Sequence, residues 1–130
     1  MGIVSVAATA NLALNVDEVG DLPTTCPSNF LISVTSLNKS DEKAPNAAWG
    51  QQHIDLGAYG QEVFTAASNG DGYFSGTSYA APQVSGAVAL LYSAPCPSLI
   101  ALAKTNPGVA AFWAKSLILE NVTPNSSLAG

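Results

Sequence analysis

The sequence has little charge of either sign and no long apolar run. Only four Lys or Arg and nine Asp or Glu occur among its 130 residues, for a net charge of −5. Such an acidic surface repels phosphate backbones and anionic lipids, which disfavours nucleic acid as a partner. The longest apolar run, 84–92, is interrupted by Ser85 and Gly86 and is too short to cross a bilayer. The sequence therefore predicts no membrane span.

Cysteine and histidine are scarce. Cys26 and Cys96 are the only cysteines and match no CxxC or metal-ligand spacing, so no zinc site is expected. Two readings stay open for them, a disulfide or two small buried thiols, because sequence alone cannot supply disulfide geometry. The redox compartment therefore stays open as well.

The residues that are abundant indicate a single α/β core. Apolar residues make up 48% of the chain, enough for one domain or part of one. The run Ile3–Ala8 is short, β-branched and ends in a polar loop, as a buried parallel strand does. Phe30–Leu37 predicts a second strand. Asn15–Asn29 has no period and is expected to be a surface loop.

The second half of the chain predicts a β-hairpin followed by helices. Extended pieces are expected at Ile54–Gly60 and Glu62–Ala67, and the turn-forming stretch 68–72 leads from the latter into a returning strand. Apolar residues then recur at helical spacing, which predicts a buried helix from Ser78 to Tyr92 with Pro82 in its first turn. Further helices are expected over 98–104 and 108–120.

Ser78 stands at the predicted amino end of the buried helix, a position with chemical use. Unsatisfied backbone amides and the helix dipole favour negative charge that develops beside a serine oxygen there. Gly76 allows a substrate backbone to approach closely, and Ala80 and Ala81 let the helix pack tightly underneath. From Gly-Thr-Ser alone, a plain helix cap would be the preferred interpretation of Ser78.

The longer context changes that interpretation. The run Ser75-Gly76-Thr77-Ser78-Tyr79-Ala80-Ala81-Pro82-Gln83-Val84-Ser85-Gly86 resembles the nucleophile motif of the subtilisin-like (S8) peptidases, Gly-Thr-Ser-x-Ala-x-Pro-His-Val-x-Gly. The resemblance implies that Ser78 attacks the peptide carbonyl while a histidine takes its proton and an aspartate orients that histidine. Gln83 stands where the family usually has a non-catalytic histidine.

A second segment resembles another part of the family pattern. Ala7-Ala8-Thr9-Ala10-Asn11 is similar to the family's Ala-Ala-Gly-Asn, and Asn11 precedes Ser78 by 67 positions, a separation similar to the family's. The resemblance implies that Asn11 donates to the oxyanion beside the Ser78 amide. It also implies substrate contacts in a set of four residues: Ala8, Thr9, Ala10 and Gly76.

Three acids follow in the next loop: Asp17, Glu18 and Asp21. They could favour basic substrate side chains in the pocket that the preceding strand would line. A solvated acidic loop is the preferred interpretation of the three.

The serine, histidine and aspartate form the family's catalytic triad, and its histidine and aspartate have no counterpart in this sequence. The family's histidine lies in a His-Gly-Thr-His segment well before the oxyanion asparagine, and no such segment occurs. No Asp-x-Gly segment matches the family's aspartate motif either. His53, the only histidine, is therefore interpreted as a surface residue rather than the general base. Asp55 lies in a piece that resembles the family's extended Val-Asp-Leu and is expected to be structural.

The resemblance implies a subtilisin-like three-layer α/β fold with a parallel sheet, of which 1–130 forms the carboxy-terminal half of a peptidase S8 catalytic domain. The expected function is a serine endopeptidase that acts through an acyl-enzyme on Ser78, with its histidine and aspartate in a missing amino-terminal region. One alternative is an inactive relative that binds peptides or a partner chain. Another is the serine-carboxyl (sedolisin) branch, although Tyr79-Ala80-Ala81-Pro82 fits the S8 pattern better.

The expected partners are a peptide or protein substrate and the missing part of the chain's own domain. No cofactor is required by the sequence, and calcium is allowed by the family resemblance alone. The same resemblance favours a secreted or extracytoplasmic location, which the residues themselves leave unknown.

Overall fold

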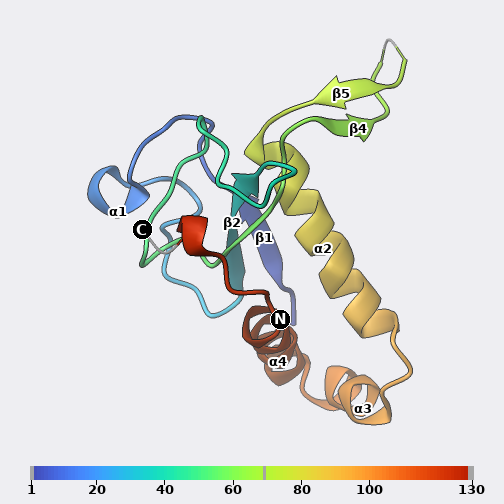
Figure 1. Cartoon of the computed structure of the whole chain (residues 1–130). Helices are drawn as coiled ribbons and strands as arrows, with labels where there is room; N and C mark the ends of the chain where they lie inside the picture. Colours follow the sequence, from blue (N-terminus) through green and yellow to red (C-terminus); the bar gives the residue numbers. More distant parts are fainter. Residues whose placement is uncertain (1, 69, 129–130) are drawn as a thin grey trace.

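The sheet at the centre of the molecule has three strands in the order β1-β2-β3 (Figure 1). The structure is a computed structural model and describes residues 2–68 and 70–128. Strand β1 is Ser5–Ala8, β2 is Leu31–Leu37 and β3 is Leu56–Tyr59. Both pairings are parallel, so the predicted α/β class and the two predicted parallel strands are confirmed.

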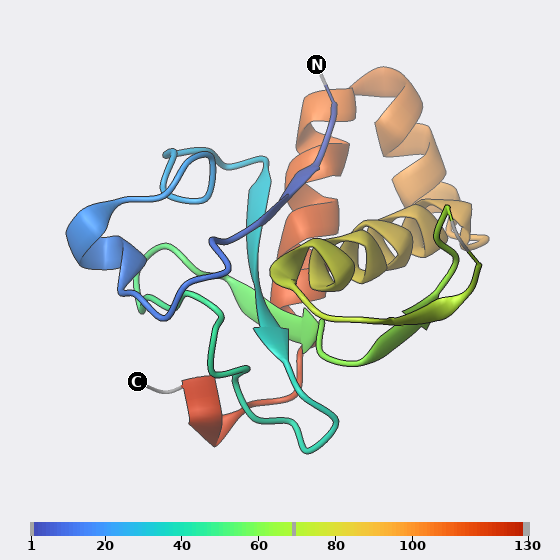
Figure 2. The same cartoon turned by 90° about the horizontal axis from the view of Figure 1, so that it is seen from above.

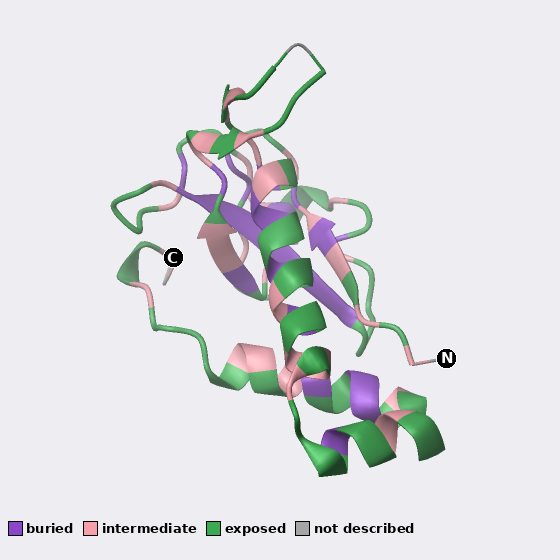
Figure 3. Cartoon of the chain, turned by 90° about the vertical axis from the view of Figure 1, so that its right-hand side faces the viewer, coloured by how far each residue is buried: buried purple, intermediate pink, exposed green. Residues whose placement is uncertain are grey.

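The strands differ in how deeply they lie. All seven residues of β2 are buried, because it is the central strand and both of its faces are covered (Figure 3). In β1, by contrast, only Ala7 is buried and Ser5 is exposed. The prediction that Ile3–Ala8 forms a fully buried strand is therefore wrong, because β1 lies at one edge of the sheet.

Three helices follow in the second half of the chain. They are α2 at Thr77–Ser93, α3 at Pro97–Thr105 and α4 at Pro107–Glu120, each within one residue of its predicted bounds. Proline begins α3 and α4, where its missing N–H costs nothing. Among the described residues, no single helix is long and apolar enough to cross a membrane. Helices α2 and α3 taken together meet those limits, but they are bent by 100° at the break.

The predicted hairpin is present, and two short helices were not predicted. Strands β4 (Val63–Thr65) and β5 (Gly72–Phe74) pair antiparallel and project beyond the amino end of α2 (Figure 1). Helix α1 (Val16–Val19) lies within the stretch expected to be a loop, and Asn15 caps it by accepting from the Asp17 amide. A 3-10 turn, η1, spans Ser126–Leu128.

The apolar core lies between α2 and one face of the sheet. Small residues on the helix let it approach the strands closely. The cluster consists of Ile32, Val34 and Leu56 from the sheet and Ala80, Ala81, Val84 and Val88 from α2. The opposite side of α2 is exposed, with Leu90 at 72% relative exposure (Figure 3). The helix is thus buried on the side that carries Ala80, Val84 and Val88, as the helical spacing of the apolar residues predicted.

Irregular chain covers the other face of the sheet. The Ser33 hydroxyl donates to the Thr24 carbonyl at 2.8 Å, and the Thr35 hydroxyl donates to the Ala48 carbonyl at 2.6 Å. Seen from above, the sheet separates α2 from these loops and from α1 (Figure 2). Ile32 and Val34 of β2 therefore face α2, and the hydroxyls of Ser33 and Thr35 face the loops.

Candidate active site

The amino end of α2 is built on two glycines that approach each other closely. Gly76, the N-cap, has φ 153°, a backbone conformation that other residues rarely adopt. Its amide donates to the Gly60 carbonyl at 2.6 Å, just after the end of β3. A Cβ placed on Gly60 would lie 2.6 Å from the Gly76 carbonyl oxygen and 2.5 Å from Ser36 Oγ. Both positions therefore require glycine.

Thr77 ties the start of the helix to the end of β1. Its side chain is fully buried, and its hydroxyl donates to the Thr9 carbonyl at 2.5 Å. Its backbone amide donates to Asn11 Oδ1 at 2.8 Å. Because Thr9 and Asn11 both follow β1 directly, these two bonds hold the strand end and the helix start in one arrangement.

The Asn11 carboxamide lies against the first residues of α2. Its Oδ1 accepts from the Thr77 amide and would be 3.4 Å from a Cβ on Gly76. Its Nδ2 makes no hydrogen bond to any part of the chain that the structure describes. With the oxygen held and the side chain exposed, the free N–H groups of Asn11 are available as donors at this helix end.

Ser78 is the second residue of α2 and is exposed. Within residues 2–68 and 70–128, its hydroxyl forms no hydrogen bond. Its amide is one of the first four of the helix, which have no acceptor within the helix. The arrangement allows the Ser78 amide and the Asn11 carboxamide to donate to one anionic oxygen. The catalytic roles of the two residues stay predictions.

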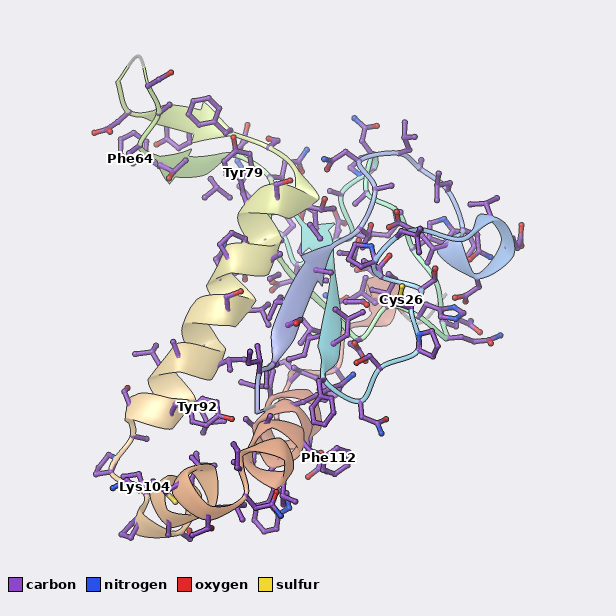
Figure 4. The ribbon with its side chains drawn as sticks, turned by 180° about the vertical axis from the view of Figure 1, so that it is seen from behind. Cys26, Phe64, Tyr79, Tyr92, Lys104 and Phe112 are labelled. Carbon is purple, nitrogen blue, oxygen red and sulfur yellow. The ribbon has the colours of Figure 1, made fainter. Side chains whose placement is uncertain are left out.

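Gln83 stabilises the first turns of the same helix. Its Nε2 donates to the Tyr59 carbonyl at 2.5 Å and to the Tyr79 carbonyl at 2.9 Å, which joins α2 to the end of β3. Tyr79, labelled in Figure 4 near the hairpin, also stacks on Phe74, with ring centroids 5.8 Å apart. Pro82, expected in the first turn, is instead the sixth residue of the helix. Sequence patterns gave no sign of the Gln83 contacts.

The segment predicted to contact substrate is fixed on two sides. Ala8 ends β1, and Thr9 after it is buried. The Ala10 amide donates to Asp21 Oδ2 at 3.0 Å, and its carbonyl accepts from the Ala48 amide at 3.0 Å. The segment is therefore held in place before any ligand arrives. Substrate contacts by Ala8, Thr9, Ala10 and Gly76 stay predictions.

His53 binds Asp17 of helix α1. Its Nδ1 lies 2.8 Å from Asp17 Oδ1. Burial by itself would raise the pKa of Asp17, but hydrogen bonds from His53 and from the amides of Gln52 and Gln51 together lower it. Helix α1, which carries Asp17, lies across the sheet from α2 in both Figure 1 and Figure 2. The described residues show no bond from His53 to Ser78, and the expectation that His53 is not the general base stays a prediction.

Asp55 holds the sheet together. Its Oδ2 accepts from the Ser33 amide at 2.8 Å and lies 3.4 Å from the Lys115 ammonium of α4. Lys115 also donates to the Leu31 carbonyl. The contacts of Asp55 are therefore structural, as expected.

The two cysteines fit neither reading left open by the sequence. Cys26 and Cys96 are both exposed and both free thiols. Cys96 caps α3, and its pKa is lowered by hydrogen bonds from the Ser98 hydroxyl and nearby backbone amides. Within the described part of the chain, no three His, Cys, Asp or Glu side chains gather closely enough to hold a metal ion.

One cavity of this chain lies apart from Ser78. It measures about 300 Å³ and lies between β3, the loop before it and the η1 turn, where Trp49, Ile54 and Leu128 contribute to its walls. Neither Ser78 nor Asn11 lines it. The candidate site is thus an exposed helix end, not an enclosed pocket of this chain.

Comparisons with known proteins point to one protein family. The sequence profile of the Subtilase family, peptidase S8, matches residues 1–123. Subtilisin-like protease 2 of Plasmodium falciparum is 33% identical over 93 residues, which cover 71% of this chain and 7% of that protein. This chain therefore spans only a small part of that relative's length.

Two solved structures resemble the fold closely. A cold adapted subtilisin-like serine proteinase superposes with a TM-score of 0.71 at 26% identity, over 96% of this chain and 40% of that one. The self-cleaved protease domain of PatA superposes with a TM-score of 0.72 at 25% identity, over 99% of this chain and 46% of that one. The chain thus spans less than half of either structure.

Proposed function

Because the chain belongs to the subtilase family of serine proteases, we propose that it carries the nucleophile and the oxyanion donors of a subtilisin-like endopeptidase. One observation carries the proposal: the Asn11 carboxamide is bound through its oxygen to the Thr77 amide, next to Ser78, while its nitrogen is free. Asn106 also binds through its oxygen alone, to the Val109 amide at the start of α4, so a free amide nitrogen by itself does not mark a catalytic asparagine. Asn11 differs because its free donor lies beside an exposed serine at a helix amino end.

The reaction follows from these groups. Ser78 Oγ attacks the carbonyl carbon of the scissile peptide as a base takes its proton, and the carbonyl electron pair moves onto the oxygen. The Ser78 amide and Asn11 Nδ2 donate to that oxyanion. When the intermediate collapses, the C–N bond breaks, the amine leaves with the proton, and an ester on Ser78 remains for water to hydrolyse.

The base is proposed to come from outside the described residues. We propose that the triad histidine and aspartate lie in an amino-terminal part of the domain. By the same proposal, that part is a binding partner of this chain. Extracytoplasmic action is proposed on the same family grounds. Calcium binding is likewise proposed on family grounds alone, and no step above uses a metal.

A fluorophosphonate probe tests the proposal. The chain joined to the amino-terminal part of its domain should be labelled at Ser78, and Ser78→Ala should abolish labelling and lower turnover by about 10⁶-fold. Ser85→Ala is the matched control, since Ser85 is exposed on the same helix and its hydroxyl donates only to the Ala81 carbonyl. The control should be labelled normally. The chain alone should not be labelled, because a serine hydroxyl without a base is a weak nucleophile.

A second candidate function is peptide binding without turnover. The position of His53 favours it, because the only histidine of the chain is bound to Asp17 across the sheet from α2. A completed protein that binds peptides but resists the probe would establish this alternative.

A further inference from the structure

The cavity beside β3 has the size and the walls of a site for a small molecule. Its volume, about 300 Å³, stands at the lower end of the range for ligand sites, roughly 300–1,000 Å³. Three separate segments supply apolar side chains to its walls: Trp49 and Ile54 from the loop before β3, Leu56 from β3 and Leu128 from η1. An apolar space that stays empty loses dispersion contacts along its walls, so an apolar group gains by filling it.

Two charged residues also line this cavity, Lys43 and Asp55. The carboxylate of Asp55 is already compensated, since its Oδ2 accepts from the Ser33 amide and lies 3.4 Å from the Lys115 ammonium. Those contacts join β2 to α4, so Asp55 is committed to the fold. The described residues therefore offer no uncompensated negative charge to a cation in this cavity.

The ammonium of Lys43 lacks such compensation. It donates to the carbonyls of Ala44 and Ala47, both at 3.1 Å, which hold it in place but carry no net charge. An ammonium has three N–H donors, and in the described part of the chain only two of these donors find an acceptor. No carboxylate within residues 2–68 and 70–128 pairs with Lys43. A partly buried cation without a carboxylate favours an anion from outside.

We propose that this cavity binds a small apolar carboxylate, such as a medium-chain fatty acid. The hydrocarbon part of the ligand lies against Trp49, Ile54 and Leu128, and its carboxylate accepts a hydrogen bond from the Lys43 ammonium. The apolar walls supply affinity, and the charge-assisted bond fixes which end of the ligand faces Lys43. The site uses neither Ser78 nor Asn11, so it is independent of the proposed peptidase function.

Octanoate and octanol are a matched pair of probes, because they share a hydrocarbon chain and differ in charge. Trp113→Phe leaves Trp49 as the only tryptophan, and the fold should be kept because Trp113 is exposed. Octanoate should change the Trp49 fluorescence until the site is saturated, and octanol should do so with an affinity about tenfold weaker. Absence of a saturable change with octanoate would overturn the site, and equal affinities would overturn the role of Lys43.

A variant of Lys43 tests the charged contact. Lys43→Met removes the charge and keeps the length of the side chain, so octanoate should bind no better than octanol, whose affinity should stay unchanged. Lys39→Met is the matched control, since Lys39 pairs with Glu62 and does not line the cavity. The control should bind octanoate normally. A Lys43→Met variant that still prefers octanoate would refute the contact.

A variant of Ile54 tests the position of the site without changing its charge. Ile54→Phe fills part of the cavity and should weaken both probes by a similar factor, which isothermal titration calorimetry measures. This variant decides the question even if Lys43→Met fails to fold through loss of its bonds to Ala44 and Ala47. Unchanged binding of both probes to Ile54→Phe would place them elsewhere on the protein and overturn the inference.

The same titration on the chain joined to the amino-terminal part of its domain tests whether the cavity stays open. Octanoate should bind the joined protein as tightly as it binds the chain alone. Binding to the chain alone, but not to the joined protein, would show that the amino-terminal part covers the cavity and would overturn the inference.

Discussion

The two ends of α2 are held to the molecule by different kinds of contact. At the amino end, directional hydrogen bonds from Gly76, Thr77 and Gln83 reach the ends of β3 and β1. Toward the carboxy end, Val88 packs in the core while Leu90 is exposed. Apolar contact stabilises a helix but tolerates small shifts, whereas hydrogen bonds fix atoms in place. The end with the directional bonds is the one that carries Ser78.

The largest effect should come from removing the proposed oxyanion donor, Asn11. Asn11→Ala should lower turnover of the completed enzyme by about 100- to 1000-fold, because one oxyanion donor is lost. Steady-state kinetics on a peptide substrate would measure this, with KM changing little.

Asn11→Asp refines that test. It keeps an oxygen for the Thr77 amide and replaces the free donor with a negative oxygen, so turnover should fall at least as far while the melting temperature holds. Full activity in Asn11→Asp would contradict the oxyanion role.

An intermediate effect is expected at Thr77, which joins the end of β1 to the start of α2. Thr77→Val keeps the shape of the side chain but leaves the Thr9 carbonyl buried without its donor, which should cost about 1–3 kcal/mol of unfolding free energy. Urea unfolding would measure the loss. Thr77→Ser retains the hydroxyl and should recover most of it. An unfolding free energy of Thr77→Val equal to that of the native protein would show that the hydrogen bond contributes nothing.

The smallest effect is expected at the exposed carboxy end of α2. Leu90→Gln should change the unfolding free energy by less than about 0.5 kcal/mol and leave probe labelling unaltered, since the side chain lies mostly in solvent. Val88→Ala, two residues earlier but in the core, should cost about 2 kcal/mol by the same denaturant measurement. A large loss of unfolding free energy in Leu90→Gln would mean that Leu90 makes a contact that the structure does not show.

The same contrast explains what could be predicted from the sequence. Periodic segments were predictable: α2, α3 and α4 begin and end within one residue of the expected positions. The resemblance also pointed to Asn11 and Ser78, which the structure brings to one helix end, although their chemistry is still untested. Contacts between segments with no periodic pattern were not predictable.

Particular residues show why those contacts were missed. Asp21 lies in a loop without a hydrophobic period, so no pattern could relate it to Ala10, 11 positions earlier. The four-residue helix α1 is too short to show a period and depends on its Asn15 cap. The exposure of β1 depends on its place at the sheet edge, which a strand's own residues do not encode.

The close approach of Gly60 to Gly76 limits how this protein can evolve. A methyl group at position 60 would meet the Gly76 carbonyl and the buried Ser36 hydroxyl, and the first of these is backbone that cannot rotate away. Even alanine there must displace Gly76, the N-cap of α2, two positions before Ser78. In a library of all single substitutions, position 60 should therefore tolerate no replacement when selection is for catalysis, although it lies outside the sequence motif that contains the nucleophile.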